Sequence, residues 1–187
     1  LPNDLQVILI SDPLSTQSTA LLSCNVGSYY DHNCALGMLH FIEHLSFMGT
    51  QKYPKENYYD ELISQYSGYN NASTSSFYTI YHFDVNNEHF EKCLDCFAQF
   101  FIWPLFTASA TKRELNAVHS EHQNNISNLY SQSFRSTEML FSVLSPLSRF
   151  STGDIYSLKD YPEKKNFSLR EEMLSFHKKY YSANIMK

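Results

Sequence analysis

Two histidines stand four residues apart in the stretch His40-Phe41-Ile42-Glu43-His44, and a glutamate directly precedes the second. On an α-helix, residues i and i+4 share one face about one turn apart, so both imidazoles can approach a single metal ion. Two neutral imidazoles at this spacing suit tetrahedral zinc. Glu43 lies on an adjacent face, near the position that the protein ligands leave open, where a carboxylate can accept a proton from water. The motif therefore predicts a helix that is buried around a polar metal centre inside a packed domain.

Length and composition agree with such a domain. The chain has 187 residues, of which 43% are hydrophobic and 18% charged, so we expect residues 1–187 to form a single domain with its own core. A net charge of −5, with Lys and Arg scattered along the chain, argues against a nucleic-acid partner. No apolar run reaches the length of a membrane span. The four cysteines are too few for a disulfide framework, and we expect them to be structural.

The pattern of apolar residues predicts the secondary structure. Strands are expected at residues 5–10, 20–26 and 77–85, and helices at residues 34–47, 56–66, 87–103, 111–130, 133–144 and 168–181, with a loop over 147–166. This order has too few strands for a barrel and no regular βαβ alternation. We therefore predict an α+β fold in which helices pack on one face of a mainly antiparallel sheet. The small polar residues 71–76 are expected to form an extended edge whose backbone can pair with another strand.

A catalytic zinc site usually has three protein ligands and one water, so a third ligand is needed. The H-x-x-E-H order reverses the H-E-x-x-H signature of zinc peptidases, in which the glutamate acts as a base. Glu114 and Glu121 lie seven residues apart on the helix predicted over 111–130, hence on nearly the same face. His119 and His122 point elsewhere on that helix. From the residues alone, the two glutamates are equally good third ligands.

Several longer motifs carry a resemblance to a known family. They are His40 to Thr50, Lys52 to Asn57, Asn71-Ala72, Phe83-Asp84-Val85, Phe97 to Phe101, Arg113 to His122 and Tyr180-Tyr181-Ser182. In these stretches the chain resembles the insulysin and nardilysin branch of the pitrilysin family of zinc metallopeptidases. The similarity covers nearly the whole chain in order. It implies the fold of pitrilysin and of the mitochondrial processing peptidases.

The resemblance also implies an activity, a zinc-dependent hydrolysis of peptide bonds in short peptides, and a role for each motif residue. It implies one Zn²⁺ per domain on His40, His44 and Glu121, with Glu43 as the general base and Glu114 as a supporting residue near the site. Peptide substrates would add to the edge strand at Asn71 and Ala72 by β-augmentation, in which their backbones pair with the strand.

The family also implies the wider setting. Its members are long chains whose domains close over the substrate, so we expect an N-terminal catalytic domain that is truncated at its C-terminal end, from a cytoplasmic or alternatively mitochondrial protein. The alternative is a non-catalytic structural or assembly subunit of the same fold. Such relatives usually lose motif residues, and none is lost here. The small residue Ser73 is similar to the residue that nardilysins carry at this position. Nardilysins, however, have an acidic insertion before the zinc motif that this chain lacks, so both subtypes stay open.

Overall fold

The computed structural model describes residues 1–187, which contain one three-stranded antiparallel sheet. Its strands are β1 (Gln17–Cys24), β2 (Tyr69–Thr74) and β3 (Thr79–Asn86), in the order β1-β3-β2. Strand β3 is central, and the register aligns Ala72 of β2 with Tyr81 of β3. Strand β2 is therefore an edge, which confirms the prediction for residues 71–74, whereas 75 and 76 lie in the turn to β3.

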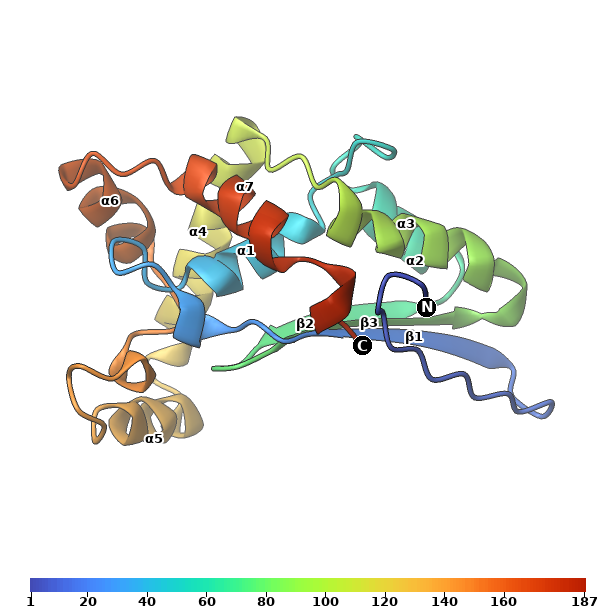
Figure 1. Cartoon of the computed structure of the whole chain (residues 1–187), viewed down its shortest axis with the longest axis horizontal. Coiled ribbons are helices and arrows are strands. Elements are labelled where there is room, and N and C mark those ends of the chain that lie inside the picture. Colours follow the sequence, from blue (N-terminus) through green and yellow to red (C-terminus); the bar gives the residue numbers. More distant parts are fainter.

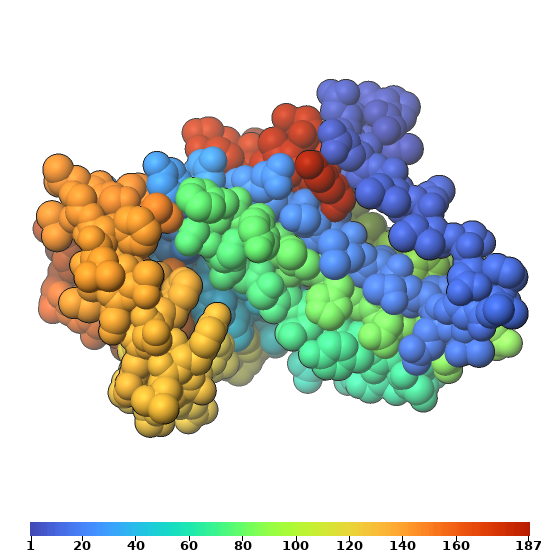
Figure 2. All heavy atoms as spheres, turned by 90° about the horizontal axis from the view of Figure 1, so that it is seen from below, coloured from blue at the N-terminus to red at the C-terminus, as the bar shows by residue number.

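Helices cover one face of this sheet, and further helices lie beyond its end (Figure 1). They are α1 (Met38–Ser46), α2 (Tyr58–Gln65), α3 (Phe90–Ile102), α4 (Ala108–Asn125), α5 (Leu129–Glu138), α6 (Tyr161–Lys164) and α7 (Leu169–Tyr180). Figure 1 shows α1, α2, α3 and α7 above the sheet and α5 to one side, below its level. In Figure 2 the blue and green residues of the strands lie open on the opposite face, beside the yellow and orange residues of α5 and the segment after it. This arrangement confirms the predicted α+β architecture. No helix is both long enough and apolar enough to cross a bilayer.

The core forms where the sheet meets the helices. Along β3, Tyr81, Phe83 and Val85 are buried, and the residues between them are only half-buried, as expected for a strand with one covered face. The ring of Phe83 packs against that of Phe97 on α3 at 5.2 Å. Burying one such phenylalanine stabilises the fold by roughly 1.5–3 kcal/mol. The four cysteines are free, and three of them are buried.

Helix α1 is enclosed nearly all round, as its pattern predicts. Leu39, Phe41, Ile42 and Leu45 are all fully buried. The helix starts at Met38, later than predicted, because residues 34–37 form a turn. The carboxylate of Asp31 accepts hydrogen bonds from the N–H groups of Gly37 at 2.7 Å and Leu39 at 2.8 Å, and so satisfies the free donors at the helix start.

The strand predicted at residues 5–10 is wrong. This segment pairs with no strand, and Ile8, Leu9 and Ile10 are each about nine-tenths exposed. A β-branched segment gains its stability from a neighbouring strand and from burial, and here it has neither. Strand β1 pairs with β3, far along the chain.

The helix predicted at residues 168–181 is confirmed by α7, but the boundaries predicted at 111–130 and 133–144 are wrong. Helix α4 begins at Ala108, because the hydroxyl of Thr107 accepts from the N–H of Ala110 and caps it. The side chain of Asn128 accepts from two N–H groups and starts α5, so the helix expected at 133–144 begins earlier and ends at Glu138. The predicted loop 147–166 contains a π-helical turn (Tyr156–Asp160) followed by α6.

Candidate metal centre

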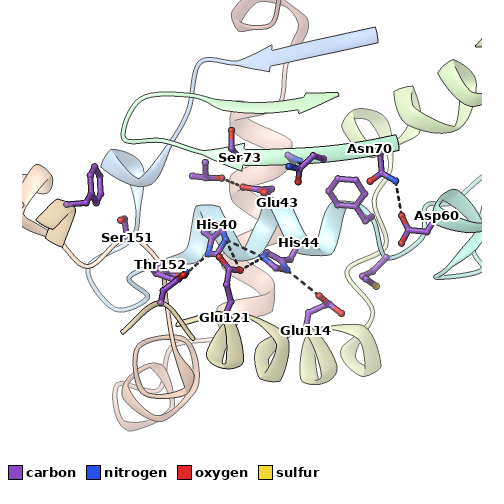
Figure 3. A pocket seen from close by; sticks show the side chains of 17 residues that line it. His40, Glu43, His44, Asp60, Asn70, Ser73, Glu114, Glu121, Ser151 and Thr152 are labelled. Carbon is purple, nitrogen blue, oxygen red and sulfur yellow. Dashed lines mark hydrogen bonds and ion pairs between the residues drawn. The ribbon is translucent and has the colours of Figure 1, made fainter. Parts of the chain in front are cut away.

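Helix α1 presents His40 and His44 on one side, and Glu121 reaches them from α4 (Figure 3). The Nε2 atoms of the two histidines are 3.2 Å apart, and Oε2 of Glu121 lies 3.7 Å from His40 and 3.4 Å from His44. Zinc bonds of about 2.0–2.2 Å at tetrahedral angles separate neighbouring ligand atoms by about 3.3 Å. The spacing and the donor set therefore fit one zinc ion. The role of these residues as ligands stays a prediction.

The outer nitrogen of each histidine also has a partner. Nδ1–H of His40 donates to the carbonyl oxygen of Thr152 at 2.7 Å, and Nδ1 of His44 lies 3.4 Å from Oε2 of Glu114. Such outer partners fix the orientation and tautomer of metal-binding imidazoles. Glu114 and Glu121 thus approach opposite nitrogens of the same ring, that of His44. Both are therefore close enough to the site to have been equally good candidates for the third ligand. The position of Glu114 suits the predicted supporting role.

The charges of the site depend on one another. Burial lowers the pKa of His44, but hydrogen bonds with Glu114 and Glu121 and the charge of Glu43 outweigh it and raise the pKa to about 9. The hydrogen bond from His44 lowers the pKa of Glu121, against a smaller opposing effect of burial. Without a metal, a proton on His44 balances the surrounding carboxylates. A metal ion that binds here must displace this proton.

Glu43 is buried beside the histidines, with 6% of its surface exposed. Burial is the main effect on its pKa and raises it, while the nearby His40 lowers it. The hydroxyl of Thr74 donates to Oε2 of Glu43 at 2.6 Å. The neighbouring Thr79 hydroxyl donates to the carbonyl oxygen of Val26, so it does not compete for this carboxylate. One carboxylate oxygen of Glu43 therefore already accepts a hydrogen bond from a residue of β2.

These side chains line a cavity of about 650 Å³. Strand β2 forms one wall, where Figure 3 shows Asn70 and Ser73. Asn71 and Ala72 of the same strand and Phe134 of α5 also line the cavity. The N–H of Ala72 donates to the side-chain oxygen of Asn71 at 2.9 Å. The structure thus brings every sequence-predicted site residue to one cavity. Whether Asn71 and Ala72 bind substrate stays a prediction.

Two residues that contact the site were not singled out from the sequence. Thr74 could have been found, because the two-residue period of a strand places it on the same face as Ala72. Thr152 could not, because it acts through its backbone carbonyl, which every residue carries.

Comparison with known proteins decides the family. The sequence profile described as Insulinase (Peptidase family M16) matches residues 6–147. The chain belongs to this family. Across the whole chain it is 45% identical to the human protein named insulin-degrading enzyme and 47% identical to the Drosophila melanogaster protein of that name. It also superposes on the crystal structure of pitrilysin with a TM-score of 0.95 and 32% identity over its full length.

Membership of the insulinase family confirms the resemblance seen in the motifs, and the superposition confirms the predicted fold. The chain covers only part of these relatives. It spans 18% of the human protein, 19% of the fly protein and 20% of the pitrilysin chain.

Proposed function

We propose that this chain forms the zinc-binding catalytic domain of a metalloendopeptidase that hydrolyses short peptides. The observation that carries the proposal is the convergence of His40, His44 and Glu121 within 4.8 Å of one another, with Glu43 in the same cavity. Its membership of a peptidase family supports the same conclusion.

A zinc ion held by the two histidines and Glu121 would supply a Lewis acid that lowers the pKa of water and polarises a peptide carbonyl. Glu43 would take the proton of the attacking water and pass it to the leaving amine. Its free oxygen for this task is Oε1, since Oε2 already accepts the Thr74 hydroxyl. Burial favours the protonated form of Glu43, which makes this carboxylate a stronger base than an exposed one.

The edge of β2 would hold the peptide. No strand of the chain pairs with its outer side, and Asn71 and Ala72 lie on it beside Glu43. A peptide that adds as a further strand would align its backbone along the cavity. In that pose the Asn71 side chain would move away from the Ala72 N–H, which it now accepts from. This N–H could then donate to a carbonyl oxygen of the peptide. We also expect further domains to close over the peptide in a cytoplasmic protein.

Zinc analysis and cleavage of a quenched fluorescent peptide test the proposal together. We expect one zinc per chain, and cleavage that a chelator abolishes and added zinc restores. His44→Ala should lose both the metal and the activity, because it removes one of three ligands. Purified protein with neither zinc nor cleavage would contradict the proposal and would fit the non-catalytic subunit instead.

A further inference from the structure

Helix α5 is anchored by charge. Its apolar side chains Leu129 and Tyr130 are more than four-fifths exposed, and Glu138 is its one buried residue, at 8% exposure. Oε2 of Glu138 accepts from Nη1 of Arg135 one turn earlier, at 2.8 Å. A buried carboxylate is stable only where it is paired and hydrogen-bonded. The position of α5 therefore depends on what this pair contacts.

The pair contacts the segment 148–152, which we call the histidine-support loop. Nη1 of Arg135 also donates to the carbonyl oxygens of Ser148 and Arg149, each at 3.1 Å. The other carboxylate oxygen of Glu138 accepts from the hydroxyl of Ser151 at 3.1 Å. Both charged groups thus bind the same loop, one through its backbone and one through a side chain.

Aromatic contacts hold the middle of this loop. The guanidinium of Arg135 lies 5.9 Å from the ring centre of Phe150. Phe150 also packs edge to face against His122 of α4, with ring centres 4.9 Å apart. His122 directly follows Glu121 in the sequence. The loop is therefore clamped between α5 and the helix that carries the predicted third ligand.

The last residue of the histidine-support loop contacts His40. The residue after Ser151 is Thr152, whose carbonyl oxygen accepts from Nδ1–H of His40 (Figure 3). That hydrogen bond leaves Nε2 of His40 as the nitrogen with the free lone pair, directed toward His44 and Glu121. If the carbonyl moved, the ring could rotate or change its tautomer.

We propose that the Arg135–Glu138 pair is a positioning device for the metal centre. It fixes the histidine-support loop and, through the carbonyl of Thr152, the orientation and tautomer of His40. The inference rests on the proposed function, in that His40 is taken as a metal ligand. It adds residues that lie outside the ligand set and act only through the loop.

Zinc affinity, measured by competition with a chromophoric chelator, tests the device. Arg135→Gln should weaken zinc binding about tenfold, the size of effect seen for outer partners of metal ligands. Arg135→Lys, which keeps the charge, should retain most of the affinity. Ser151→Ala removes a single hydrogen bond and should weaken binding about threefold, which keeps the test valid if Arg135→Gln fails to fold. Ser136→Ala, on the same helix but outside the pair, should bind like the wild type.

A second readout needs no metal. Long-range ¹H–¹⁵N spectra of zinc-free protein labelled at histidine report which nitrogen of His40 carries its proton. We expect the Nδ1–H tautomer in the wild type and a mixture in Arg135→Gln. Unchanged tautomer and unchanged zinc affinity in Arg135→Gln would overturn the inference. If the tautomer of His40 differs between the wild type and Arg135→Gln but the wild type binds no zinc, the proposed function is contradicted. The positioning of His40 by the Arg135–Glu138 pair would still be supported.

Discussion

The hydroxyl of Thr74 donates to Oε2 of Glu43 across 2.6 Å, and so joins the end of the edge strand β2 to the helix that carries the histidines. The strand proposed to hold the peptide and the carboxylate proposed to move the proton are thus in direct contact. A substrate that aligns along β2 would meet Glu43 in a fixed orientation.

Removing this hydrogen bond should slow the reaction without removing the metal. The hydrogen bond holds the Glu43 carboxylate in one orientation, and misplacing a reacting group by about 1 Å can cost about 10²-fold in rate. We expect Thr74→Val to lower kcat at least tenfold at unchanged zinc content, since Thr74 contacts no predicted ligand. Thr74→Ser keeps the hydroxyl and should stay near the wild type. Steady-state kinetics with a quenched peptide, beside metal analysis, check this; wild-type kcat in Thr74→Val would count against it.

The two glutamates of α4 should differ in their effect on zinc. Glu121→Gln removes an anionic ligand atom from the cluster and should leave the purified protein nearly free of zinc. Glu114→Gln weakens only the outer partner of His44 and should reduce zinc affinity about 10–100-fold while the protein still fills at high zinc. Titration with zinc against a chelator distinguishes them. Equal losses in the two variants would show that Glu114 is itself a ligand.

The free energy of unfolding should decrease as the pH falls, because the buried His177 resists protonation. This residue is 7% exposed, it donates from Nε2 to the carbonyl of Phe100, and it stacks on Tyr181. Burial lowers its pKa from 6.5 to about 4, against a smaller opposing effect of the hydrogen bond. Between these values the unfolded chain binds the proton and the folded chain does not, so the free energy of unfolding rises with pH. The whole change amounts to roughly 3 kcal/mol.

Urea unfolding at several pH values checks this. In His177→Gln the slope between pH 4 and 6.5 should be shallower than in the wild type. The difference between the two proteins at pH 8, where the wild-type histidine is neutral in both states, measures the packing cost alone. Parallel curves over the whole range would refute the role of His177.

The centre of the site could be predicted because its information is local. The i, i+4 spacing of His40 and His44 defines the face of a helix, and the small residues after Asn71 indicate an exposed edge. Glu121 lies on another helix, and spacing alone could not separate it from Glu114. The two differ in which nitrogen of His44 they face and in that Glu121 also lies near Nε2 of His40, and both depend on how α1 and α4 pack.

Two of the missed features depend on distant partners, and a third depends on a local helix cap. The apolar residues 5–10 have the composition of a strand, yet a strand also needs a neighbour, and β1 pairs with β3 instead. The start of α5 depends on the side chain of Asn128, which caps it, and a capping residue in a polar stretch is easily passed over. The carbonyl oxygen that supports His40 belongs to the backbone of Thr152, 112 positions away. Because every residue carries such a carbonyl, the residue type at position 152 does not predict the contact.

The most direct test of the central claim is the zinc content and peptidase activity of Glu43→Gln. This substitution keeps the size of the side chain and leaves His40, His44 and Glu121 intact, but it removes the group that accepts the proton. We expect one zinc per chain, as in the wild type, and no measurable cleavage of a quenched peptide. Full zinc content together with substantial cleavage would contradict the role of Glu43 as the base.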